Sequence, residues 1–169
     1  MNKKGQAAME FLMTYGWAIV VVLAAIGALA YFGVLSPQKL LPDRTTFTAP
    51  LPSVDNAVVT LATNTVQIAF KNNKGVDITL PLTATGNGNC NGAVAVTGTY
   101  TNSTGGSQPI VAGVTQIQNG GGFLLTFTCP ANAGAQVGSK FKADITFPYV
   151  NFETQQTLSQ SGSVEGKYS

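Results

Sequence analysis

The fold is decided by the stretch Met9–Leu35, which reads MEFLMTYGWAIVVVLAAIGALAYFGVL. Glu10 is the only charged residue among these 27. At ~1.5 Å per residue, a helix of this length is roughly 40 Å long, which is enough to cross a ~30 Å hydrocarbon core with some tilt. No other part of the sequence is as apolar over a comparable length. The sequence therefore predicts an N-terminal helix that can span a membrane.

Three interpretations of this segment compete. It is a plain membrane anchor, or a secretory signal peptide with Lys3 and Lys4 in front and a cleavage site at 28–30 (Ala-Leu-Ala), or a helix that keeps its place after a short leader is removed. Glu10 is unusual inside an export signal, and the apolar run continues to Leu35. An unpaired charge at membrane depth costs ~2.5 kcal/mol or more, so Glu10 needs a partner.

Cleavage between Gly5 and Gln6 would supply that partner. It creates an α-amino group four residues before Glu10, which could pair with this carboxylate in the same chain or in a neighbouring copy. Cyclisation of an N-terminal Gln would remove the amine charge and weaken the pairing.

The residues 3–12 (KKGQAAMEFL), followed by 15–19 (YGWAI), resemble the class III signal peptide of archaeal type IV pilins. The resemblance covers about the first 35 residues and lies in the basic pair, the Gly-Gln junction, the Glu four residues after the Gln and the Tyr-Gly-Trp-Ala run. It implies that a membrane-embedded prepilin peptidase cuts between Gly5 and Gln6, and that Glu10 acts in assembly.

The resemblance also implies where the protein works and with what. The chain would insert in the cytoplasmic membrane first. The pilus assembly machinery would then build it, with copies of itself, into an extracellular filament on the cell surface. The apolar helices would form the filament core, and the filament would serve adhesion. The positive-inside tendency agrees, because Lys3 and Lys4 place the N-terminus in the cytoplasm.

The composition supports a weakly charged surface and argues against several functions. The chain has 169 residues, which suits one compact domain plus the helix. Loss of Met1–Gly5 removes two of the nine basic residues and leaves seven basic and seven acidic side chains. Such a surface allows many copies to pack without mutual repulsion, and it has no basic patch for nucleic acid.

The sequence predicts no enzyme, no cofactor and no metal site. It has no His, which excludes His-based acid–base catalysis, His ligands and an ordinary Ser triad. The acidic residues show no calcium-loop spacing. The triple glycine at 120–122 opens no phosphate-binding helix and lacks the following Lys-Ser/Thr.

Two modifications are predicted for the part of the chain outside the cell. Cys90 and Cys129 form an even pair in an oxidising compartment, which indicates a disulfide, although two buried free thiols are the alternative. Asn102 begins an Asn-Ser-Thr sequon in a predicted loop and is a candidate for glycosylation.

From about Val54 the apolar period changes from helical to two, which indicates strands with one buried face. The clearest alternations span 66–70, 76–82 and 141–147, and shorter candidates span 57–62, 93–100, 110–117, 123–129 and part of 152–168. Seven or eight strands separated by Gly- and Asn-rich turns predict an antiparallel β-sandwich of immunoglobulin-like architecture, and hence an α+β chain.

The predicted domain order follows from these signals. Residues 1–5 are the leader, 6–35 the helix and 54–169 the extracellular β-domain. Between them, 36–53 contains four prolines and is interpreted as a semi-rigid linker or an extended lead-in strand.

Three other functions stay open at this stage. The first is an archaeal flagellar filament subunit, which shares the processing and the plan of helix plus β-domain. The second is a membrane-anchored, monomeric β-sandwich that binds an extracellular ligand. The third is a soluble domain released by cleavage at Ala30.

Overall fold

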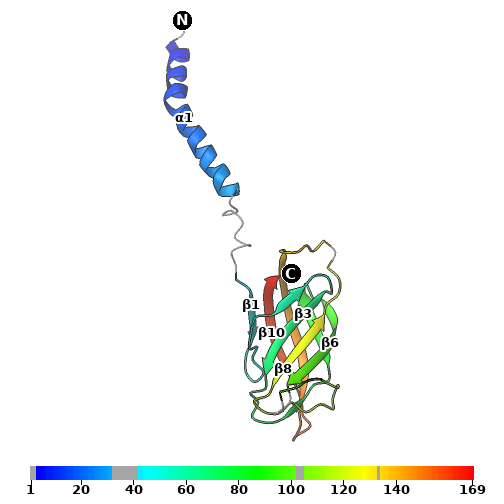
Figure 1. Cartoon of the computed structure of the whole chain (residues 1–169). Helices are drawn as coiled ribbons and strands as arrows, with labels where there is room; N and C mark the ends of the chain where they lie inside the picture. Colours follow the sequence, from blue (N-terminus) through cyan, green and yellow to red (C-terminus); the bar gives the residue numbers. More distant parts are fainter. Residues whose placement is uncertain (1–2, 32–41, 102–104, 133) are drawn as a thin grey trace. The chain divides into compact units, whose positions relative to one another are not determined.

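The computed structural model describes residues 3–31, 42–101, 105–132 and 134–169. The chain divides into two compact units, Met1–Leu41 and Pro42–Ser169. The first contains one helix and the second a curled β-sheet (Figure 1). The two units are described separately below.

The helix α1 spans Lys3–Tyr31, 29 residues in all. Ala, Leu and Met favour this conformation, and they outweigh the weaker helix propensity of the three valines at 20–22. Its backbone includes the Gly5–Gln6 junction. The predicted end of the helix near Leu35 and the linker residues up to 41 lie outside the described residues.

Ten strands follow within the described part of the chain. They are β1 (Arg44–Phe47), β2 (Val58–Thr60), β3 (Thr65–Lys71), β4 (Ile78–Thr79), β5 (Thr83–Gly88), β6 (Gly92–Thr101), β7 (Ser107–Pro109), β8 (Gly122–Thr128), β9 (Lys140–Asn151) and β10 (Thr157–Lys167).

All strands belong to one sheet with the order β1-β10-β9-β5-β6-β8-β3-β2, while β4 pairs with β9 and β7 with β6. Every named pairing is antiparallel. The sheet curls so strongly that its two edges meet. Val59 of β2 forms a parallel bridge to Tyr168, and Ser53, after β1, bridges to Phe70 of β3.

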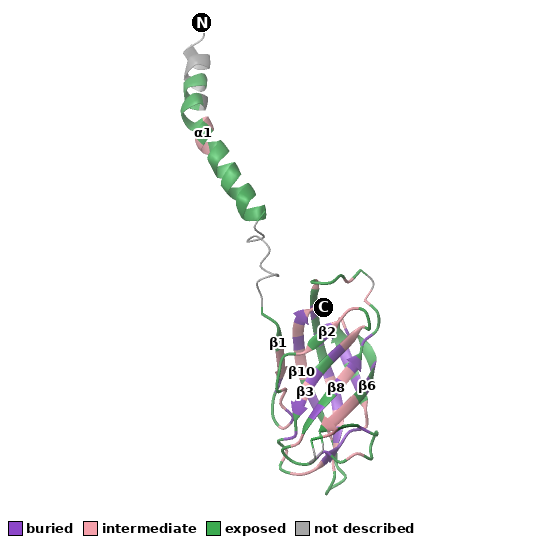
Figure 2. Ribbon diagram, viewed as in Figure 1, coloured by how far each residue is buried: buried purple, intermediate pink, exposed green. Residues whose placement is uncertain are grey.

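The inside of the curled sheet holds the core (Figure 2). Phe147 of β9 lies 5.2 Å from Phe70 of β3 and 5.9 Å from Phe127 of β8, measured between ring centroids. These strands are not neighbours in the sheet, so the two halves of the sheet pack face to face across the aromatic rings. Phe47 closes the same cluster from β1, with its centroid 5.0 Å from that of Phe70.

The prediction of an apolar helix followed by an antiparallel β-domain is confirmed. The alternation in the segments that became β3, β8 and β9 is confirmed residue by residue, with Phe141, Ile145 and Phe147 buried and Lys142 and Asp144 exposed along β9. The structure adds that the facing halves form one continuous hydrogen-bonded sheet.

The predicted boundary of the β-domain at residue 54 is too late. The second half of the predicted linker belongs to the β unit, because β1 pairs with β10 over residues 44–47. Leu51 is fully buried, and Lys71 donates a backbone hydrogen bond to the carbonyl of Pro52 at 3.1 Å. The carbonyl of Pro50 likewise accepts a backbone hydrogen bond from Asn73 at 3.0 Å, so this Pro-containing segment is tied to the β unit.

Two predicted strands are largely wrong. The alternation at 76–82 gives only the two-residue β4, because Ile78, Thr79 and Leu80 are all buried in succession. The segment 110–117, which was predicted as a short strand, is instead a hydrogen-bonded loop. Conversely, the Gly-Asn repeat after Thr85, predicted as a turn, continues β5 to Gly88. A Cβ on Gly86 would overlap the carbonyl oxygen of Cys90, so this strand needs glycine there.

Candidate functional site: the apolar surface of α1

The most unusual surface of the protein is that of α1. Its large apolar side chains are exposed on every side of the helix where the structure describes them, from 46% for Leu29 to 87% for Tyr31. The segment Met13–Tyr31 is long and apolar enough to cross a membrane, and none of it is buried within the chain. A helix that is apolar all round needs an apolar environment outside the chain.

One face of α1 carries a shallow groove of about 420 Å³. Phe11, Tyr15, Ala18 and Val22 follow the helical spacing along it, with Ile19 and Leu23 at its border. The rings of Phe11 and Tyr15 lie 4.8 Å apart, tilted by 37°. Because the side chain of Ala18 is small, it leaves the groove open beside the rings of Phe11 and Tyr15. Such a face can accept the side chains of another helix or the tails of lipids.

Glu10 lies at the start of this surface and is exposed. The hydroxyl of Thr14 donates a hydrogen bond to the main-chain carbonyl of Glu10 at 2.8 Å, so it does not neutralise the carboxylate. Within the described residues the carboxylate of Glu10 forms no ion pair. The predicted partner, a new α-amino group on Gln6, would exist only after cleavage and stays a prediction.

The remaining predicted site residues have different outcomes. Cys90 and Cys129 form the predicted disulfide, with Cα atoms 4.8 Å apart and a sequence separation of 39. It joins the turn after β5 to the end of β8, and both residues are buried. Gly5 and Gln6 lie in α1, and nothing tests whether the bond between them is cut. Asn102 lies outside the described residues.

No cluster of three or more His, Cys, Asp or Glu side chains suited to a metal ion occurs among the described residues. The prediction that the protein is not an enzyme stays a prediction. The sequence did not indicate a polar cavity in the β unit, because it predicted a strand at 110–117, where the structure has a loop that lines this cavity.

No protein-family model and no curated protein sequence matches the chain. Among solved structures, the CooA pilin subunit from enterotoxigenic Escherichia coli is similar, at 11% sequence identity. The alignment covers 71% of this chain and 97% of the CooA chain, with a TM-score of 0.33. At this TM-score the similarity supports no conclusion about the fold or function of this chain.

Proposed function

We propose that this protein is a structural subunit of an archaeal type IV-like surface filament, which polymerises through α1 and serves adhesion. The observation that carries the proposal is the combination of an all-round apolar, unburied helix with the KKGQAAMEFL leader pattern at its N-terminal end. A helix of this kind serves first as an anchor in the membrane and then as the core of the filament. The leader pattern explains why the helix would be kept after processing.

The β unit supports the same proposal. Its core is closed by its own strands, and none of the core residues comes from α1. The apolar surface of α1 is therefore not needed to complete this fold and is available for contacts between copies. A repeated head-to-tail contact between helices produces an open filament, whereas a self-complementary contact would stop at a dimer.

Glu10 receives a specific role in this proposal. When helices pack together, its carboxylate would leave water, and the α-amino group of a processed Gln6 would neutralise it. Removing one partner of a buried ion pair is destabilising by ~3–5 kcal/mol. Assembly should therefore depend on Glu10 more strongly than membrane insertion does.

The test is a comparison of filaments sheared from cells that express the native chain, Glu10→Gln or the control Glu153→Gln. Glu153 is an exposed acidic residue of the β unit, so its substitution removes the same charge away from α1. We expect Glu10→Gln to be processed normally but to lower the filament yield by at least about 10-fold, and Glu153→Gln to leave the yield unchanged. A normal yield from Glu10→Gln would remove the role given to this residue.

Processing has its own test. Replacing Gly5 by a bulky residue should block cleavage, and intact mass then reports a chain that keeps Met1–Gly5. Native mature chains should begin at Gln6. A mature chain that begins at Tyr31 would contradict the proposal outright, because the helix would be gone.

The other functions give different results in the same cells. A monomeric membrane anchor would stay in the membrane fraction and never enter sheared filaments. A flagellar filament subunit would enter filaments that rotate with the cell, whereas a pilus stays static.

A further inference from the structure

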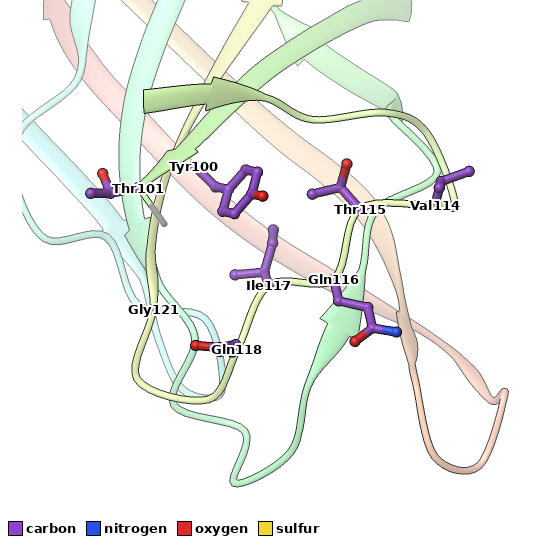
Figure 3. A pocket seen from close by; sticks show the side chains of 8 residues that line it. All are labelled: Tyr100, Thr101, Val114, Thr115, Gln116, Ile117, Gln118 and Gly121. Carbon is purple, nitrogen blue, oxygen red and sulfur yellow. The ribbon is translucent and has the colours of Figure 1, made fainter. Parts of the chain in front are cut away.

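A cavity of about 450 Å³ lies in the β unit between the end of β6 and the loop that joins β7 to β8 (Figure 3). Its volume falls within the ~300–1,000 Å³ of ordinary small-molecule sites. Its polar lining consists of the phenol of Tyr100, the hydroxyls of Thr101 and Thr115, and the amides of Gln116 and Gln118.

The loop that forms one wall of the cavity is held in place by hydrogen bonds from the side chain of Asn72. This side chain is completely buried, and its Nδ2 donates hydrogen bonds to the carbonyls of Ile117 and Gln118 at 3.0 and 3.2 Å. Ile117 also exchanges two backbone hydrogen bonds with Ile78, at 2.8 and 3.1 Å. Burying an amide is favourable only when it is fully hydrogen-bonded, so Asn72 fixes the shape of this wall.

The start of the loop is fixed on β6 beside Tyr100. Ile110 donates a backbone hydrogen bond to the carbonyl of Gly98 at 2.8 Å. A Cβ on Gly98 would lie 2.9 Å from Ile110 Cδ1 and 2.8 Å from Leu125 Cδ2, so any larger residue at position 98 would force these side chains to shift. Farther along, the Thr115 hydroxyl accepts a hydrogen bond from Val111 N–H at 2.8 Å. The cavity is therefore pre-formed, which lowers the entropic cost of binding.

The lining selects the chemistry of the ligand. None of the described residues that line it is Asp, Glu, Lys or Arg, so a charged ligand would lose water without gaining a counter-charge from them. The side-chain amides of Gln116 and Gln118 have no protein hydrogen-bond partner in the part of the chain that the structure describes. Each amide offers both donors and an acceptor, which a purely apolar ligand would leave unpaired.

Tyr100 adds an aromatic surface to the lining and so further defines the chemistry of a suitable ligand. Tyr100 is partly buried, and Figure 3 shows its ring next to the loop, with Ile117 below the ring and Thr115 to the right of it. An aromatic face next to amides and hydroxyls suits a ligand that has an apolar ring face and several neutral hydroxyl groups. Sugar rings have this combination, since their C–H groups can pack on the tyrosine while their hydroxyls bond to the glutamines.

We propose that this cavity is a binding site for neutral saccharides, with Tyr100 as the stacking residue and Gln116 and Gln118 as hydrogen-bonding residues. All of these groups belong to one β unit, so the site does not depend on whether the chain polymerises.

The experiment uses the full chain in micelles of lauryldimethylamine oxide, a detergent without a sugar head group. Saturation-transfer NMR measures the binding of cellobiose, maltose, lactose and N,N′-diacetylchitobiose, with glucuronate and glucose 6-phosphate as charged comparisons. We expect at least one neutral disaccharide to bind, and the charged sugars to bind at least ~10-fold more weakly. Absence of binding by all four neutral sugars, or a preference for the charged ones, would overturn the proposal.

Substitutions locate the binding. Tyr100→Ala should weaken the best disaccharide by about 10-fold, whereas Tyr100→Phe should retain affinity within ~3-fold because it keeps the aromatic face. Gln118→Ala should weaken it by roughly 3- to 10-fold. Tyr31→Ala is the matched control, since this tyrosine lies in α1. Amide spectra verify that each variant is folded, and unchanged binding by folded Tyr100→Ala would show that the sugar sits elsewhere.

Discussion

The two units use the same apolar residue types in opposite ways. Phe70 of β3 is 1% exposed, surrounded by the rings of three other strands, while Phe11 of α1 is 61% exposed and touches only Tyr15 among the aromatic residues described. The β unit satisfies its own apolar surface by curling its sheet until the edges meet. The side chains of α1 do not cover one another in this way, and in the proposed function lipid or other copies of the chain cover them.

Because of this difference, we expect the β core to determine the stability of the folded monomer and the surface of α1 to determine assembly. A substitution in the β core should destabilise the monomer, whereas a substitution on α1 should alter only what the monomer binds. The predictions below test this separation, beginning with the largest effect.

The largest expected effect is that of Phe70→Ala. The loss of this ring leaves a cavity in the aromatic core and should lower the free energy of unfolding of the β unit by about 3–5 kcal/mol. The matched change Phe11→Ala should alter it by less than ~0.5 kcal/mol, because Phe11 is not one of the core residues of the β unit. Hydrogen exchange of the β3 and β8 amides in the full chain measures both. Trp fluorescence would not, since the only Trp is residue 17 in α1.

Equal effects of the two phenylalanine changes would break the comparison. They would mean that α1 contributes to the stability of the β unit, and the helix surface would then be part of a fold and not a free assembly surface.

The disulfide gives the next largest effect. Replacing both Cys90 and Cys129 by Ala removes a cross-link over 39 positions, and the loop-entropy relation gives a loss of roughly 3–4 kcal/mol. The effect should appear in the unfolding of the β unit by denaturant, while membrane insertion of α1 stays unchanged. A double variant as stable as the native chain would show that the core alone holds β5 and β8 together.

The sequence predicted well wherever one local pattern matches one local structure. The apolar run gives α1 directly, and strict alternation gives β3 and β9, because a half-buried strand presents every second residue to the core. The even pair of cysteines was sufficient to predict the disulfide. In each case the burial of a side chain follows from its position in a single element.

The failures come from long-range contacts that no local pattern contains. The segment 110–117 was predicted as a short strand, but it is held as a loop by the buried Asn72 from another part of the chain and by the backbone hydrogen bond from Ile110 to Gly98. The strand β1 lies in the Pro-rich segment 36–53, for which the sequence left both a linker and an extended lead-in strand open, and only its pairing with β10 decides between them for residues 44–47. The polar cavity arises from the same loop, so its residues could not be grouped from the sequence alone.

The smallest expected effect concerns an ion pair on the outer surface of the β unit. Lys142 Nζ of β9 lies 2.8 Å from Glu165 Oε1 of β10. The hydrogen bond and the charge of Lys142 lower the pKa of the Glu165 carboxyl, with smaller contributions from Lys140 and Arg44, and the same pairing raises the pKa of Lys142. Both groups are in contact with water, so the pair adds little to stability and salt weakens it.

The sign of the pH dependence follows from these two directions. Stability from Glu165 is present above the ordinary glutamate pKa and is lost as the pH falls through its lowered value in the folded protein, while stability from Lys142 is lost only as the pH rises through its raised value. Lys142→Met should therefore raise the pKa of the Glu165 carboxyl towards the ordinary value of ~4.3, as measured by the pH dependence of its carboxyl ¹³C chemical shift. Added salt should raise the same pKa in the native chain. Lys74→Met, which removes a charge from another loop of the unit, should leave that titration unchanged. If Lys142→Met had no effect, the pair would not form in solution, and the outer surface of β9 and β10 would offer two unpaired charges to a neighbouring copy.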